Sequence, residues 1–356
     1  NSYVRSLSKL YETGSVSSST IENFHSSMYG GEIINSIVYG SFSFSGDVQA
    51  SYSCVPFNVY YFGVGCIDVD PLFCNADSSD FTLYDNSTCI GTGQDGANMG
   101  AYGIGCEFIE YLGPNWYVSS SGSDDNDGSE ESPFATIQHG INVASDGDTV
   151  LVSAGTYLEN INYNGKNILI QGESKEATII DGNALDAVVS FVNNESRSAI
   201  LREFTITNGS NSEGGGIHID HASPTIENCI ITQNHGIPTG GGIFSNSHPN
   251  NIYRPIIKNC LIINNTANVE AGAVKFHNSE GALINCTIVN NSGPKSVMSS
   301  YSNMHIRNSI FYSNDGYGAA SHSGSLIISY SNIENGWPGF GNIDSEPLFI
   351  DMENGD

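Results

Sequence analysis

Short runs of β-branched and apolar residues recur along the second half of the chain, and each run ends in asparagine or glycine. Four phrases align directly, IENCIITQN, IKNCLIINN, LINCTIVNN and IRNSIFYSN, and LREFTITNG fits the same frame. Their central residues repeat every 23 to 31 positions: Phe204, Cys229, Cys260, Cys286 and Ser309. Runs of this kind are typical of short β-strands. The pattern therefore predicts repeated units with two or three strands each.

A unit of this length cannot bury a core alone, so the units are expected to stack on one another. In a parallel stack, strands lie about 4.8 Å apart and equivalent side chains form ladders. The three cysteines of the repeat are predicted to pack inside the coils, because their spacing matches no zinc motif. Two asparagine ladders are expected at the bends. One contains Asn228, Asn259, Asn285 and Asn308, and the other contains Asn208, Asn234, Asn265, Asn291 and Asn314.

An amphipathic helix is predicted before the first unit. Phe134, Ile137, Ile141 and Ala144 recur at helical spacing, and Ser132 is suited to the N-cap. A helix at this place would cover the open end of the stack, which otherwise exposes unpaired strand edges.

The stretch WYVSSSGSDDNDGSEESPFATIQHGINVASDGDTVLVSAGTY precedes the Gly-rich phrases GGGIHIDHASPTIENCIITQN and GGGIFSNS. Together they resemble the right-handed parallel β-helix repeat proteins of the pectate-lyase-like superfamily, in particular the secreted bacterial surface type with tandem modules. The resemblance covers residues 116–356 and implies an all-β fold, a right-handed parallel β-helix solenoid. It does not imply one function, because this fold hosts lyases, hydrolases, esterases, adhesins and fibre proteins.

The end of this pattern is also found near the N-terminus. DPLF at 70–73 matches EPLF at 346–349, and NSIVYG from Asn35 matches NSIFYS from Asn308. Residues 1–113 are therefore expected to be the C-terminal coils and closing segment of one β-helix module. Residues 114–356 are expected to be a second module, with an N-terminal capping helix but without its closing segment. Such a chain is expected to be part of a tandem array or to stack end to end on copies of itself.

Charge and cysteine content narrow the setting. Eleven Lys and Arg against 38 Asp and Glu give a formal net charge of -27, which argues against nucleic acid as a partner. No apolar run has the length needed to insert into a membrane. Cysteines concentrate in the non-repetitive part of the first module, which favours an extracellular or cell-surface protein. Cys54 with Cys66, and Cys74 with Cys89, are candidate disulfides, although sequence alone does not fix the pairing.

Three aligned phrases, GIHIDH, GIFSNS and GAVKFHN, show which side chains face outward. Period-2 alternation gives two outward columns: His218, Phe244 and Lys275, and beside them Asp220, Asn246 and His277. In an enzyme, Lys275 would be the base of a β-elimination and His277 or His218 the acid, with Asp220 nearby. Because the columns contain one carboxylate and no arginine, a non-catalytic face is favoured. On that face, Phe244, Asn246 and His277 are the candidate carbohydrate-binding residues.

A calcium site is a separate possibility. Asp124, Asp125, Asn126 and Asp127 precede a glycine and offer the oxygen ligands that Ca²⁺ prefers. The glutamate that an EF-hand requires at its twelfth position is absent. The alternative is a solvated acidic loop.

The sequence thus predicts an extracellular structural protein, either a filament subunit that assembles head to tail or a surface-array or adhesin module that binds glycans. The alternative is a calcium-assisted polysaccharide lyase or another carbohydrate-active β-helix enzyme. An enzyme should show a groove with clustered acids and a base, and a filament subunit should show complementary ends.

Overall fold

The computed structural model describes residues 2–5, 10–11, 15–22, 26–39, 42–55, 63–67, 69, 71–75, 80–84, 87–106, 114–248 and 253–350. The chain divides into two compact units, Asn1–Glu110 and Tyr111–Asp356. The expected boundary at residue 113 and the repeated Asp70 lie outside the described residues. Among the described helices, none has the length and hydropathy of a membrane span.

Unit 1 is built from short strands that pair mostly in parallel. Serines link successive coils, because the Ser19 N–H donates to Ser36 Oγ at 3.2 Å and the Ser36 N–H donates to Ser53 Oγ at 3.1 Å. A short 3-10 helix, η2, spans Gln94–Gly96. The described strands form three sheets: β1 (Ser2–Arg5), β4 (Ser19–Glu22) and β6 (Ile37–Tyr39); β2 (Leu10–Tyr11), β3 (Ser15–Ser17), β5 (Ser26–Ile34) and β7 (Phe42–Ser51); and β8 (Phe73–Asn75), β9 (Asp80–Tyr84) and β10 (Ile104–Cys106).

The two predicted disulfides of unit 1 are wrong, because Cys54, Cys66 and Cys89 are thiols. Cys54 pairs in register with Ile67, so strand alternation turns the neighbouring Cys66 away from it. Cys89 is buried in the core that contains Phe73, whereas Cys74 follows Phe73 on β8 and points to the other side. Cys74 itself is disulfide-bonded. Burial raises the pKa of the Cys66 thiol above its usual value.

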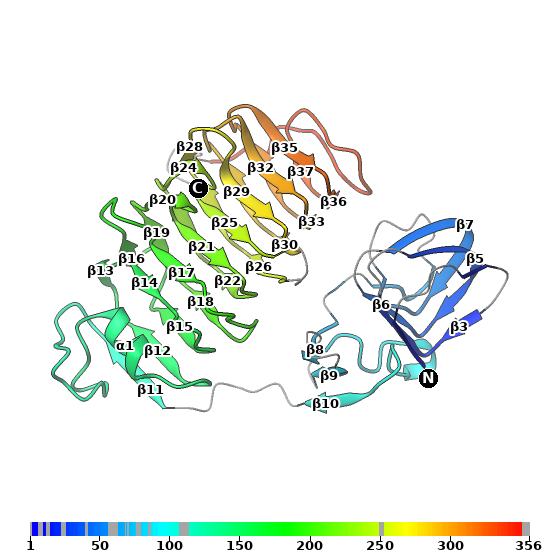
Figure 1. Cartoon of the computed structure of the whole chain (residues 1–356), viewed down its shortest axis with the longest axis horizontal. Coiled ribbons are helices and arrows are strands. Elements are labelled where there is room, and N and C mark those ends of the chain that lie inside the picture. The colour runs from blue at the N-terminus through cyan, green and yellow to red at the C-terminus, as the bar shows by residue number, and fades with distance from the viewer. Residues whose placement is uncertain are drawn as a thin grey trace. The chain divides into compact units, whose positions relative to one another are not determined.

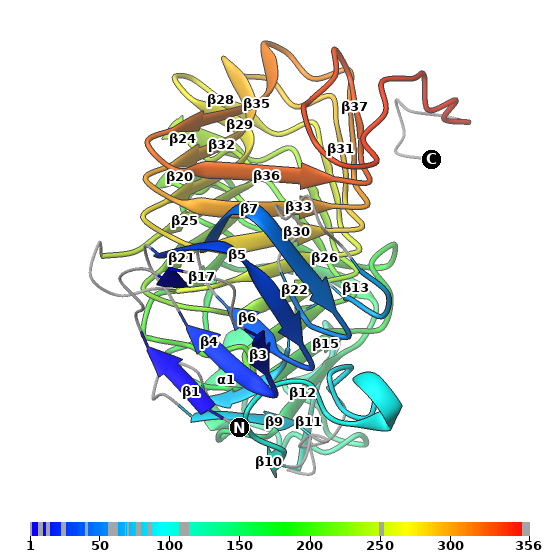
Figure 2. The ribbon, with the colours of Figure 1, turned by 90° about the vertical axis from the view of Figure 1, so that its right-hand side faces the viewer.

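Unit 2 is a solenoid of parallel strands, stacked coil upon coil from β11 to β37 (Figures 1 and 2). The nine-stranded sheet contains β11 (Asn115–Val118), β12 (Thr149–Val152), β15 (Leu169–Gly172), β18 (Ile200–Arg202), β22 (Thr225–Glu227), β26 (Ile256–Lys258), β30 (Gly281–Ile284), β33 (Asn303–Arg307) and β36 (Ser325–Ser329). The eight-stranded sheet contains β13 (Gly155–Leu158), β16 (Thr178–Asp181), β19 (Thr205–Thr207), β23 (Ile230–Thr232), β27 (Leu261–Ile263), β31 (Thr287–Val289), β34 (Ile310–Tyr312) and β37 (Asn332–Ile333).

A third face carries the residues of the candidate site. The seven-stranded sheet contains β14 (Ile161–Asn162), β17 (Val189–Phe191), β21 (Ile217–Asp220), β25 (Ile243–Asn246), β29 (Ala271–His277), β32 (Lys295–Ser300) and β35 (Tyr317–His322). Three short strands, β20 (Ser210–Glu213), β24 (His235–Thr239) and β28 (Thr266–Ala267), form a further sheet in the turn before it. These counts refer to the described residues of unit 2.

Apolar ladders fill the interior of the coils. Strands of the nine-stranded sheet pair so that their central side chains stack inward, each at most 1% exposed: Val150, Ile170, Leu201, Ile226, Ile257, Leu283, Ile306 and Ile328. At about 25 cal/mol per Å² of apolar surface, such burial is the main stabilising contribution to each coil.

The inner asparagine ladder links four coils. Asn234, Asn265 and Asn291 each donate Nδ2 to the Oδ1 of the next asparagine at 3.0 Å, and Asn314 is the last acceptor. Asn208 is not part of this ladder, contrary to the prediction. Because Thr207 pairs with Thr232, the residue level with Asn234 is Gly209, whose N–H donates to Asn234 Oδ1 at 2.9 Å. Asn208 instead donates to Asp181.

The outer ladder occupies a bend with left-handed backbone. Asn228, Asn259, Asn285 and Asn308 have φ of 53°, 55°, 54° and 50°. Asparagine tolerates this conformation better than most residues. Cys229, Cys260 and Cys286 follow at the next position, where they are buried thiols that bond to backbone carbonyl groups. Burial raises the pKa of the Cys260 and Cys286 thiols, as expected for core residues.

Helix α1 (Ile137–Val143) packs against β11, β12 and β14 through the buried Ile137 and Ile141. It begins later than predicted. Thr136, not Ser132, is the N-cap, and its Oγ1 accepts the N–H of His139 at 3.2 Å. The reason is that Phe134 pairs with Val118 as extended backbone, so the helix cannot start before it.

Candidate functional site

The two outward columns of the seven-stranded sheet lie as the alternation predicted. His218 pairs with Phe244, and Phe244 with Lys275. In the same register Asp220 pairs with Asn246, and Asn246 with His277. The columns continue upward through Met298 and Ala320, and through Ser300 and His322.

An open groove of about 570 Å³ lies along these columns. Its floor is formed by β25 and β29, and its wall by residues of β20 and β24 and by the turn after β25. Polar and titratable side chains dominate the lining: Ser212, Glu213, His221, Thr239, Asn246, Ser247, His248, Glu270, Lys275, His277 and Asn278, with Phe244 and Pro238 as the apolar part.

Lys275 is paired with a carboxylate in the groove. Its Nζ donates to Glu270 Oε2, and its side chain is only 10% exposed. Burial alone would raise the pKa of Glu270, but the hydrogen bond and charge of Lys275 outweigh burial and lower it. Lys275 is therefore engaged by a carboxylate, which does not suit the predicted role of a base that must be free to accept a proton.

Phe244 is 5% exposed, so it does not present a ring face on which a sugar could stack. Lys275 Nζ lies 5.4 Å from the ring centroid, and the His218 ring lies 6.4 Å from it. Gly214 and Gly240, which follow β20 and β24, approach Phe244 closely: a Cβ on Gly214 would lie 3.0 Å from the Phe244 N, and a Cβ on Gly240 would lie 2.7 Å from the Phe244 Cβ. Phe244 thus supports the groove from beneath.

His277 lies beside this pair with its Nδ1 buried and without a hydrogen-bond partner. Burial first, and then the positive charge of Lys275, lower the pKa of His277. The imidazole is therefore neutral near pH 7.

Tyr301 was missed by the sequence reasoning. It is 56% exposed, and its ring packs edge to face on His277 at 5.7 Å and on His322 at 5.4 Å. It lies at the bend after β32 with φ 52°. An exposed aromatic ring next to a polar groove is the feature that Phe244 was expected to supply.

Two carboxylates lie at the other end of the columns. Asp220 Oδ1 is 2.8 Å from His221 Nδ1 and accepts a hydrogen bond from Asn246 Nδ2 at 3.0 Å. Glu213 Oε2 is 3.4 Å from His218 Nε2. His218 is thus near the carboxylate of Glu213, and His277 lines the groove. Asp220 is engaged by His221 and Asn246.

In the acidic turn at Asp124–Asp127, Asp124 holds the N-cap residue of helix α1. Asp124 accepts the N–H groups of Ala135 and Thr136, both at 2.9 Å, and the Thr136 hydroxyl at 2.8 Å. Burial alone would raise the pKa of Asp124, but these hydrogen bonds outweigh it and lower the pKa. Asp127 and Asn126 bond to Ser129 and Pro133. Across the described residues, no group of three or more His, Cys, Asp or Glu has an arrangement that would hold a metal ion.

Comparison with known proteins identifies the fold. Residues 167–347 match the family described as right handed beta helix region, and residues 120–166 match a protein family of unknown function, DUF1565. Uncharacterized protein YwoF of Bacillus subtilis (strain 168) is 38% identical over 18% of this chain, and the alignment spans only 17% of that protein.

Similar solved structures are pectin methylesterase from carrot (16% identity, TM-score 0.45, 64% of this chain and 78% of that chain) and pectin methylesterase PemA from Erwinia chrysanthemi (12%, 0.43, 63% and 80%). Pectate lyase Pel9A is 16% identical, with a TM-score of 0.31 over 67% of this chain and 83% of that chain. These likenesses bear on the fold alone. The predicted right-handed parallel β-helix is confirmed, and the chain belongs to the family described as right handed beta helix region.

Proposed function

We propose that this protein is an extracellular, non-catalytic β-helix module that binds a neutral glycan along the groove of the seven-stranded sheet. The observation that carries the proposal is the groove of about 570 Å³, lined by polar side chains and flanked by the exposed Tyr301. Sites that bind small molecules are typically concave and combine a few polar groups with apolar or aromatic surface. The columns run along the solenoid, which suits an extended ligand.

A neutral ligand is favoured by charge. The net charge of -27 repels polyanions. Within the groove, the cation Lys275 is already paired with Glu270, and Glu213 adds a negative charge. Hydroxyl groups can instead accept hydrogen bonds from Asn246 or Asn278, which line the groove.

A non-catalytic role is favoured over the alternative, a calcium-assisted lyase. A lyase of that kind requires a basic residue that is free to take a proton next to a carboxylate. Lys275 is the predicted base, but it is paired with Glu270, and Asp220 is engaged by His221 and Asn246.

The proposal is tested by glycan-array screening, followed by calorimetry with the strongest neutral oligosaccharide. Tyr301→Ala should weaken binding at least tenfold, because the variant loses both the aromatic ring on which a sugar ring can stack and the packing of that ring against His277. Tyr330→Ala is the matched control. Tyr330 is also exposed (43%), also has a positive φ (49°) and also packs edge to face on another ring, but on a different corner of the coil. Equal losses for both variants, or new reducing ends released from the glycan, would contradict the proposal.

End-to-end stacking stays a prediction, and one contrast favours it. Ile343, Leu348 and Ile350 of unit 2 are 56%, 79% and 90% exposed. In the corresponding segment of unit 1, Leu72 and Cys74 are half-buried, and Phe73 between them is 8% exposed and packs on Phe81 of β9. Negative-stain microscopy should show filaments with an axial repeat if the exposed apolar surface is covered by another copy, and a Leu348→Asp variant should shorten them. Isolated rods for both proteins would contradict end-to-end stacking.

A further inference from the structure

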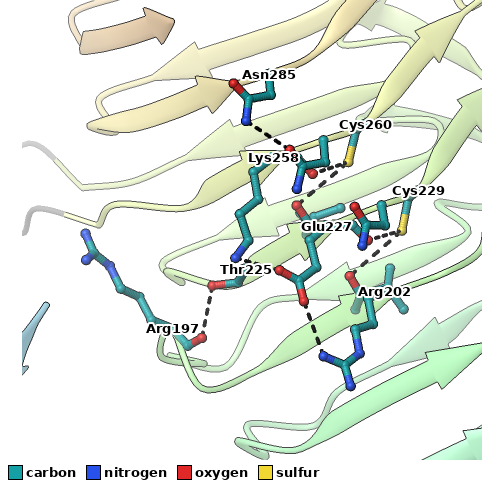
Figure 3. A network of polar contacts seen from close by, with 12 residues as sticks. Arg197, Arg202, Thr225, Glu227, Cys229, Lys258, Cys260 and Asn285 are labelled. Carbon is teal, nitrogen blue, oxygen red and sulfur yellow. Dashed lines mark hydrogen bonds and ion pairs between the residues drawn. The ribbon is translucent and has the colours of Figure 1, made fainter. Parts of the chain in front are cut away.

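The outer face of the nine-stranded sheet carries a basic column. In register, one above the other, lie Gln171, Arg202, Glu227, Lys258, Ile284 and Arg307. Glu227 is shared, with Lys258 Nζ at 2.6 Å from its Oε2 and Arg202 Nη1 at 3.5 Å from its Oε1 (Figure 3). Arg202 Nε also donates to Gln171 Oε1 at 3.0 Å. The two cations remain 35% and 39% exposed.

The charge of this column is opposite to that of the chain. The strands of the column contribute three basic residues, Arg202, Lys258 and Arg307, and one acidic residue, Glu227. The whole chain has only 11 Lys and Arg against 38 Asp and Glu. A positive stripe on an otherwise acidic protein attracts acidic surfaces and orients them.

An apolar column runs beside the basic one. Because Leu201, Ile226 and Ile257 face the core, the residues on either side of each face outward. The second outward column therefore holds Ile200, Thr225, Ile256, Ala282, His305 and Ile327. A sheet face that combines apolar side chains with arginine resembles a protein interface more than a sugar groove.

The same chain carries an ordered acidic loop that fits this face. Residues 124–131 precede helix α1, and Asp125, Asp127, Glu130 and Glu131 are exposed. The loop is fixed by Asp124, which bonds to the start of the helix. A fixed loop loses little conformational entropy when it docks.

We propose that the acidic loop 124–131 of one molecule docks on the basic and apolar columns of the nine-stranded sheet of a second copy. The two surfaces differ, so the contact is heterologous and every molecule has one of each. Such a contact propagates instead of closing as a two-fold dimer. It is independent of the glycan groove and of the exposed Ile343, Leu348 and Ile350.

The first test is the dependence of self-association on salt, measured by sedimentation velocity on the full chain. Wild-type protein should associate at about 0.05 M salt and at least tenfold more weakly at about 0.5 M, where surface charges are screened. A protein that stays monomeric at low salt over the accessible concentration range overturns the proposal.

Two variants locate the interface. Arg202→Gln/Glu227→Gln/Lys258→Gln, the column variant, removes two of the three basic residues of the column without leaving an unpaired carboxylate. The matched control is Lys175→Gln/Lys295→Gln, which removes two basic residues that lie outside the strands of this sheet. The column variant should associate at least tenfold more weakly than wild type at low salt, and the control should not. Equal association of the column variant and the wild type overturns the proposal.

The loop variant Asp125→Asn/Glu130→Gln/Glu131→Gln alters exposed side chains only, so it remains informative if the column variant folds poorly. It should lose self-association to the same extent. Mixed in equal amounts, the loop variant and the column variant should form a 1:1 dimer that grows no further, because each retains one half of the contact. Failure of the mixture to dimerise, or growth beyond a dimer, overturns the heterologous arrangement.

Discussion

Asn265 is the side chain on which the inner asparagine ladder can be tested most directly. Its Nδ2 donates to the carbonyl groups of Ile231 and Ile263 at 2.8 and 3.1 Å and to Asn291 Oδ1 at 3.0 Å. Its Oδ1 accepts the N–H and the Nδ2 of Asn234 at 3.1 and 3.0 Å. Asn265 is fully buried, so water cannot replace these partners unless the coil opens.

Replacing Asn265 with alanine removes all of these bonds and leaves the Asn234 N–H without an acceptor. Each hydrogen bond contributes about 0.5–1.5 kcal/mol to the free energy of unfolding, and a buried donor without a partner costs about 1–3 kcal/mol. Since some partners keep a second bond, we expect the free energy of unfolding to fall by about 3–4 kcal/mol. Asn265 is not among the residues with positive φ, so alanine adds no backbone strain.

The assay is equilibrium unfolding in urea, followed by circular dichroism, with hydrogen exchange of the Asn234 amide as a local measure. Asn285→Gly in the outer ladder is the control, because Asn285 makes an exposed bond to Asn259 at 3.1 Å and glycine accepts its φ of 54°. The control should lose less than about 1 kcal/mol. A loss below about 1 kcal/mol for Asn265→Ala, or equal losses for both variants, would refute the argument that buried amide bonds hold the coils together.

Three further predictions concern the groove and the turns. The pKa of Glu270 is lowered in the folded protein, because the hydrogen bond and charge of Lys275 outweigh burial. Ionised Glu270 therefore stabilises the fold above the pKa of an unfolded glutamate, and this stabilisation disappears as pH falls, so in Lys275→Met the urea midpoint should depend less on pH in the acid range. Burial and the charge of Lys275 lower the pKa of His277, so protonation of His277 favours the unfolded chain. The free energy of unfolding should therefore fall as pH drops below about 6.5, and it should fall less in His277→Gln; NMR titration of His277 measures the pKa directly. Gly241→Ala should cost at least about 2 kcal/mol in thermal unfolding, because its Cβ would lie 2.3 Å from Thr266 O, whereas at Gly318 the nearest atom is 3.9 Å away and alanine should be neutral.

The repeat made the strand register predictable, and the turns did not follow from it. Aligning Ile217, Ile243 and Val274 by period-2 alternation was enough to place both outward columns of the seven-stranded sheet. The predicted inner ladder was wrong by one residue at Asn208. In the phrase LREFTITNG, Gly209 takes the place that the buried asparagine has in the following coils.

The burial of Phe244 could not be read from the alternation, because the cover comes from another part of the coil. Gly214 and Gly240, which approach Phe244, follow β20 and β24 and lie outside the alternating stretch. Tyr301 was hidden for a related reason. It follows the column at a bend where the preceding coils have His221, Ser247 and Asn278, so no aromatic pattern pointed to it.

Coil geometry explains why the groove lies on the seven-stranded sheet. From β18 onward, two residues separate each strand of the nine-stranded sheet from the next strand of the eight-stranded sheet. That corner has a left-handed residue followed by a buried one, and an insertion there would disrupt both ladders. The turns on either side of the seven-stranded sheet vary in length and carry β20, β24 and the segment around His248. Walls can therefore rise on both sides of this sheet, whereas the nine-stranded sheet has a corner of fixed length on one side, which suits a protein surface better than a sugar.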